Sequence, residues 1–137
     1  MWLLYALLSA VFAAMVAILA KIGMQGVDSD IATAIRTVVI LFVAWGLVFA
    51  RGLTSQVHTL TTKNWTFLVL SGVATGLSWI FYFRALKIGE VAQVTPIDKL
   101  SVAMAIVLAY FFLGETPSLK VMLGAGLVVI GALVIAL

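Results

Sequence analysis

The sequence lacks cysteine and is poor in charged residues. With no cysteine among 137 residues, a disulfide framework and thiolate chemistry are both excluded. Only 9% of the residues are Asp, Glu, Lys or Arg, whereas a soluble domain typically has about 25%. The chain is 65% hydrophobic, with a mean hydropathy of +1.28. Because a soluble domain of this size could not hide so much apolar surface from water, we expect the lipid bilayer to be its solvent.

Patterns for metal, cofactor and nucleic-acid binding are also missing. His58 is the only histidine, and no second ligand-type residue accompanies it at metal spacing. The chain has no Ser/His/Asp set, no glycine-rich phosphate loop and no carboxylate pair at catalytic spacing. Its net charge of +3 is spread along the chain, without the basic run that grips nucleic acid. We therefore expect no enzyme, no catalytic residues, no cofactor, no metal and no nucleic-acid partner.

Long apolar runs fill most of the chain. A membrane-spanning helix needs about 20 apolar residues, with a range of about 17–25. Five runs meet this length: residues 2–20, 31–50, 65–88, 91–113 and 120–137. The first run lacks the positively charged start of a signal peptide, so we expect it to stay in the protein. The sequence predicts an all-α membrane protein with five transmembrane helices in one domain, residues 1–137.

Polar residues and glycine at the ends of these runs predict helix caps. Asp28 or Ser29 is placed to cap the start of the second helix, since both side chains can accept a backbone N–H. Gly89 follows the third run, where a left-handed glycine commonly ends a helix.

The basic residues are divided evenly between the two membrane faces. Five spans place Arg51, Lys63 and Lys120 on one face and Lys21, Arg84 and Lys87 on the other. The positive-inside rule therefore gives no orientation. Chance is one explanation. The other is that copies of the chain insert in both orientations. Two opposed copies could then form an antiparallel homodimer, which would take the place of the inverted repeats found in larger transporters.

Three charged residues lie inside the predicted spans. Asp98 and Lys99 are adjacent in the fourth run, and Arg36 lies at a similar depth in the second, six or seven residues or about 10 Å of helical rise from its start. Such charges are costly in lipid and usually mark function. Arg36 and Asp98 can form an ion pair if their helices are neighbours, whereas Lys99, about 100° away on the helix, should be unable to pair with Asp98. We expect these three to face a substrate or ion.

The residues just before Asp98 allow a structural interpretation as well. The segment Thr95-Pro96-Ile97-Asp98 resembles a capping box with proline at the first helical position, so that the fourth helix would start at Pro96. An intermediate arrangement is a break at Pro96 inside a longer helix, which would free backbone carbonyls near a polar site.

Hydroxyl side chains form a stripe along the third run. They follow i, i+4, i+7, i+11 spacing, which puts them on one helix face: Ser71, Thr75, Ser78 and Tyr82. Trp79 borders the stripe. We expect Thr75, Ser78, Trp79 and Tyr82 to line a substrate cavity. The alternative is close packing between helices, because Gly72 and Gly76 form a small-xxx-small pair beside the stripe.

Glycines recur on one face of the fifth run. Gly124 and Gly131 are seven residues apart, and small residues allow helices to approach closely in lipid. We expect them to form a dimer interface, with packing inside one protomer as the alternative.

Several segments resemble the EamA domain of the drug/metabolite transporter superfamily. They are FYFRALKIGEVAQVTPIDKLSVAMAIVLAYFFLGE followed by LGAGLVVIGALVI, and, nearer the start, LLSAVFAAMVAILAKIG and AIRTVVIL. Their order and spacing carry the resemblance, which covers essentially the whole chain.

The resemblance implies a half-transporter. Usual members carry two such domains in ten helices, arranged as inverted repeats around a cavity, and this chain has one. It is therefore expected to act as a homodimer, moving small metabolites or drug-like solutes by alternating access across the inner membrane of a bacterium or archaeon. The related small multidrug resistance proteins use a glutamate in their first helix. This chain has no acid there, which leaves Asp98 as the candidate proton carrier, and an Arg36 partner would keep it ionised.

Two other functions remain open. A flippase subunit for a lipid-linked carrier would use Arg36 and Lys99 to meet lipid phosphate. A membrane assembly subunit would transport nothing itself.

Overall fold

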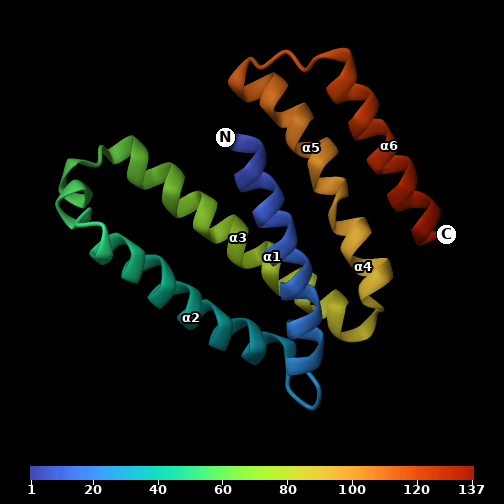
Figure 1. Ribbon diagram of the computed structural model, residues 1–137, viewed down its shortest axis with the longest axis horizontal. Coiled ribbons are helices and arrows are strands. Elements are labelled where there is room, and N and C mark those ends of the chain that lie inside the picture. The colour runs from blue at the N-terminus through green and yellow to red at the C-terminus, as the bar shows by residue number, and fades with distance from the viewer. The chain divides into compact units, whose positions relative to one another are not determined.

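Helices long and apolar enough to cross a membrane make up most of the computed structural model, which describes residues 1–137 (Figure 1). In chain order the elements are α1 (Trp2–Gly23), α2 (Ser29–Ala50), the 3₁₀ helix η1 (Thr54–Thr59), α3 (Thr62–Ile88), α4 (Val91–Asp98), α5 (Leu100–Leu108), the π-helical turn η2 (Ala109–Leu113) and α6 (Leu119–Ala136). Because α4, α5 and η2 together form a single span, Val91–Leu113, the chain has five candidate spans. The predicted all-helical, five-span fold is confirmed.

The caps explain where the second and last helices begin. An Asp28 carboxylate oxygen accepts the backbone N–H of Asp30 at 2.8 Å, so the predicted cap of α2 is confirmed. Ser118 caps α6 in the same way, by accepting the N–H of Val121 at 3.4 Å. Gly89 does follow the last residue of α3, but its φ angle is not positive, so the expected left-handed cap is wrong.

The chain divides into two compact units. Residues 18–87 form the first, here called the α2–α3 unit, and residues 1–17 with 88–137 form the second, the α4–α6 unit. In the α2–α3 unit the two long helices are joined by the segment that contains η1 (Figure 1). In the α4–α6 unit, α6 packs along both α4 and α5.

Two lysines fasten the end of the α2–α3 unit opposite η1. The Lys21 ammonium donates to the carbonyl of Leu86 at 2.6 Å and to that of Lys87 at 3.3 Å. The Lys87 ammonium in turn donates to the carbonyl of Val27 at 2.8 Å. The last carbonyls of a helix have no intrahelical partner and carry partial negative charge, so a lysine there satisfies both needs. These contacts fix the end of α3 against the α1–α2 turn.

A bidentate ion pair joins α2 and α3 at the same end. Arg84 donates from Nε to Asp30 Oδ1 at 3.0 Å and from Nη2 to Asp30 Oδ2 at 2.6 Å. This parallel arrangement is the favoured geometry between guanidinium and carboxylate. The buried residues of the unit belong to the same region: Ala20, Met24, Ser29, Thr33, Phe83 and Leu86. The contacts therefore bring Lys21, Arg84 and Lys87 to one end, as the sequence predicts.

The fourth span is interrupted at Lys99. Pro96 lies inside α4, and since it has no N–H, the carbonyl of Ala92 loses its helical donor. The N–H of Lys99 instead reaches the carbonyl of Pro96 at 3.1 Å, and α5 begins at Leu100. A helix starting at Pro96 is therefore wrong, because α4 already begins at Val91. The alternative of a break within a longer span is found, but the break lies at Lys99, three residues after Pro96.

The span ends in a wide turn. The N–H groups of Gly114 and Glu115 both reach the carbonyl of Ala109, which closes the π-helical turn η2. Gly114 has φ 67° and ψ 18°, a left-handed conformation that glycine adopts without a Cβ clash.

The ion pair at the fastened end predicts a charge-reversal pattern. Asp30→Arg or Arg84→Asp alone should lower the melting temperature of the purified protein in detergent, because like charges would then face each other. The double reversal restores attraction and should recover most of the loss, as followed by tryptophan fluorescence. Arg51→Asp reverses an arginine that has no ion pair, so it serves as the control. Equal losses in Arg84→Asp and Arg51→Asp would count against the pair.

The turn after η2 predicts a cost for Gly114→Ala. A Cβ there meets no atom within 4 Å, so the penalty comes from the left-handed backbone and should be about 1–2 kcal/mol. Gly46→Ala, in the regular helix α2 and equally free of contacts, should be neutral or slightly stabilising. Denaturant titration in mixed micelles compares the two variants. A neutral Gly114→Ala would contradict the assigned conformation.

Candidate functional site

Arg36 carries a positive charge into the second span without a protein hydrogen-bond partner at its buried nitrogen. It lies seven residues beyond the start of α2, on the helix that Asp28 caps. Its guanidinium carbon lies 4.2 Å from the centre of the Phe83 ring on α3. Nη1 of Arg36 is buried and has no hydrogen-bond partner. The ring face attracts the cation, but it leaves that donor unsatisfied.

The hydroxyl groups near Arg36 are directed elsewhere. Thr33 donates to the carbonyl of Ser29 at 2.7 Å, and Thr37 donates to that of Thr33 at 2.8 Å. Both threonines therefore bond to their own helix, as they commonly do when they lie inside one. Neither threonine hydroxyl therefore pairs with Nη1 of Arg36.

Phe83 is a site residue that the sequence interpretation missed. It is 2% exposed, and its ring packs edge-on against that of Tyr82, with centroids 5.2 Å apart and planes at 71°. Phe83 follows Trp79 by four residues, so the two share one face of α3. That i, i+4 aromatic pair was the available signal. Among the predicted site residues, the structure brings Arg36 and Tyr82 together through Phe83.

The hydroxyl stripe on α3 forms as predicted, but its role stays a prediction. Thr75 donates to the carbonyl of Ser71 at 2.8 Å, so one hydroxyl of the stripe already bonds to its own helix. Thr75 and Ser78 are exposed in the structure. Lipid, a cavity or another helix can each cover such a face.

Asp98 and Lys99 pair with each other, which corrects the expectation that they could not. Nζ of Lys99 lies 3.3 Å from Oδ2 of Asp98. The 100° separation assumed for these neighbours holds inside a regular helix, whereas the helix breaks at Lys99 and its long side chain can turn back. The predicted Arg36–Asp98 pair joins the two units and stays a prediction.

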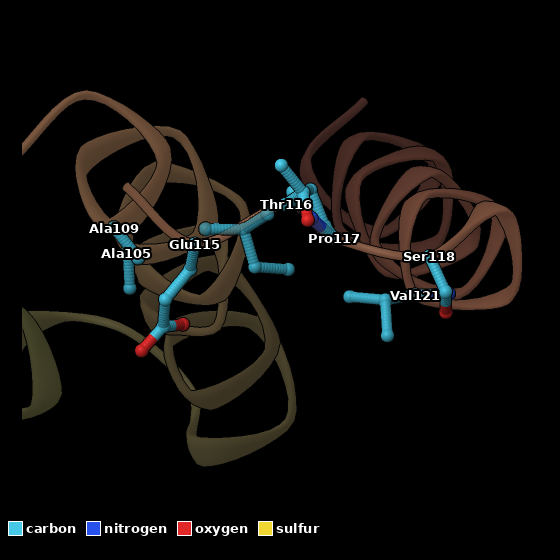
Figure 2. Close-up of a pocket in the computed structure, with 8 residues that line it drawn as sticks. Ala105, Ala109, Glu115, Thr116, Pro117, Ser118 and Val121 are labelled. Atoms are coloured by element: carbon cyan, nitrogen blue, oxygen red, sulfur yellow. The ribbon is translucent and has the colours of Figure 1, made fainter. Parts of the chain in front are cut away.

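A pocket of about 410 Å³ opens in the α4–α6 unit, at the turn between its last two spans (Figure 2). It is lined by Ala105, Ile106, Ala109, Glu115, Thr116, Pro117, Ser118 and Val121. Figure 2 shows Glu115 beside Ala105 and Ala109, with Ser118 and Val121 on the opposite side. The lining is mainly apolar with one carboxylate.

The glycines of α6 have no close neighbour within their unit. A Cβ built on Gly124 or Gly131 meets no atom within 4 Å. Packing within the unit therefore does not explain why these positions are small. The dimer interface predicted there stays a prediction.

Comparison with known proteins identifies the family. Residues 1–137 match the EamA-like transporter family. Over 135 residues the chain is 48% identical to a Sinorhizobium protein described as an uncharacterized transporter in the cobO 3′ region, and the match covers 98% of this chain and 96% of that protein. No solved structure matches. This multi-pass membrane protein belongs to the EamA-like transporter family.

Proposed function

We propose that the protein moves small metabolites or drug-like solutes across the bacterial inner membrane. It works as a homodimer of five-helix half-transporters, each protomer being one domain, by alternating access. The observation that carries this proposal is the match of the whole chain, residues 1–137 and five candidate spans, to one transporter family.

The exposure of the helices supports a dimer. In no span are more than 11% of the residues in its apolar window buried within the chain. A transport pathway needs walls that separate the solute from lipid, and larger transporters build them from two repeats. A second copy supplies the missing repeat, and an antiparallel copy would reproduce an inverted pair. Gly124 and Gly131 on α6 offer a surface on which a helix of the second copy can approach closely.

The charges inside the spans support transport over a purely structural role. Arg36, Asp98 and Lys99 each cost free energy in lipid, and a solute pathway gives them water or a ligand. Trp79 and Tyr82 supply aromatic walls, and Thr75 and Ser78 supply hydroxyls. Ligand sites commonly combine apolar walls with a few such polar groups.

Neutralising Asp98 tests the site. With a solute that stabilises the purified protein in a metabolite screen, Asp98→Asn should reduce flux into proteoliposomes by about tenfold or more, equivalent to about 1.4 kcal/mol. The reason is that it removes the acid that pairs with Lys99. Glu90→Gln removes an acid from the turn before α4 and is the matched control. Full activity of Asp98→Asn at normal expression would eliminate Asp98 from the site.

Enlarging a glycine tests the interface. Gly131→Leu should shift the purified protein from dimer to monomer in light scattering after gel filtration, because the new side chain would hold the two helices apart. Gly46→Leu adds the same side chain to α2, where it also meets no neighbour, and should leave the dimer intact. A wild-type monomer, or a Gly131→Leu dimer of unchanged stability, would contradict the proposed interface.

A further inference from the structure

The guanidinium of Arg36 has no anionic partner within the α2–α3 unit. The side chain is only partly buried, but its Nη1 is buried without a hydrogen-bond partner, and its guanidinium lies over the face of Phe83. A buried charged donor left unpaired is expensive, more so than a neutral one. A site that keeps such a donor is built to receive an acceptor.

The acids of the α2–α3 unit are already engaged. That unit has two carboxylates, Asp28 and Asp30. Asp30 binds Arg84 through both oxygens, and Asp28 caps α2 at the N–H of Asp30. Both lie at the start of α2, six or more residues before Arg36. Neither is positioned to neutralise the guanidinium.

The acid of the fourth span also has a cation of its own. Asp98 pairs with Lys99 at 3.3 Å, so the charges of these two residues compensate each other within the α4–α6 unit. Ion pairing balances Asp30 with Arg84 and Asp98 with Lys99. Among the charges well inside the spans, it leaves Arg36 without an anionic partner. Lipid hydrocarbon cannot supply the counter-charge.

The geometry of Arg36 selects the kind of anion. One face of the planar guanidinium is covered by Phe83, so a ligand approaches its N–H edge. A carboxylate lies in the guanidinium plane and accepts two parallel hydrogen bonds without disturbing the ring contact. The adjacent face of α3 carries Trp79 and Tyr82, which suit an apolar body attached to that carboxylate.

We propose that Arg36, stacked on Phe83, binds the carboxylate of the transported solute, so that the substrates are organic anions or zwitterions with an apolar body. The inference rests on the proposed transport function and names its substrate class. Arg36 is then the specificity residue, and Phe83 holds its guanidinium in position.

Matched acids and amides test the substrate class without any mutation. Melting of the wild-type protein in detergent is followed with benzoate, phenylacetate and hexanoate, and with the corresponding neutral amides. At least one carboxylate should raise the melting temperature in a saturable manner, and its amide should need at least about tenfold more ligand for the same shift. If no carboxylate stabilises the protein, or acids and amides act alike, the proposal is wrong.

Variants of Arg36 locate the site. Arg36→Gln should abolish the carboxylate shift. Arg36→Lys keeps the charge but loses the planar fork, so it should weaken binding by about tenfold or more. Arg51→Gln removes an arginine outside the spans and should bind as the wild type does. Carboxylate binding that survives in Arg36→Gln would overturn the assignment.

A double variant separates the proposal from its main rival, in which Asp98 is the partner of Arg36. If Asp98 held Arg36, Arg36→Gln and Asp98→Asn would each lower the melting temperature, and combining them would restore it. That result, with no carboxylate shift in the wild type, refutes the anion site. We expect Asp98→Asn instead to keep the carboxylate shift, because Arg36 remains.

Flux separates this inference from the proposed function. Transport of neutral solutes alone, at equal rates in wild type and Arg36→Gln, would refute the anion site and leave the transport function standing. Arg36-dependent carboxylate binding without flux of any ligand would keep the anion site and refute transport.

Discussion

A charge placed in hydrocarbon must find a partner, and this constraint governs the polar contacts of the whole chain. Arg84 meets Asp30 in a bidentate pair, Lys99 turns back onto Asp98, and Lys21 and Lys87 bind backbone carbonyls. Each contact lowers the cost of a cation at or inside the membrane. Arg36 stands apart, since it has an aromatic ring instead of an anion. This exception is the basis for proposing that a ligand supplies the anion at Arg36.

The fold was largely predictable from hydropathy, because a bilayer demands long apolar helices and turns between them. The five spans and the Asp28 cap followed directly from the sequence. The fourth span did not, because Thr95-Pro96-Ile97-Asp98 fits both the start of a helix and a proline inside one. In the structure α4 packs against α6, and residue patterns along one helix do not contain such contacts between helices.

The candidate site was predictable in its charges but not in its contacts. Arg36, Asp98 and Lys99 stood out because charge is rare in spans. Phe83 did not, because an aromatic residue in an apolar helix is ordinary until a cation from another helix lies over it. The Asp30–Arg84 pair was missed for a similar reason, since its residues are 54 positions apart. Contacts between helices require their relative rotation, which hydropathy leaves undefined.

The fastened end of the α2–α3 unit has a mechanical consequence. Lysine–carbonyl bonds and one ion pair hold the helices together there, whereas the other ends of α2 and α3 are linked through the segment containing η1 (Figure 1). A helix of about 20 residues is about 30 Å long, so a small tilt about the fastened end becomes a large displacement at the far end. Arg36 and Phe83 lie near the fastened end, where such a tilt moves them least. The hairpin can act as a lever whose fulcrum lies beside Arg36 and Phe83, the two residues proposed to bind the solute.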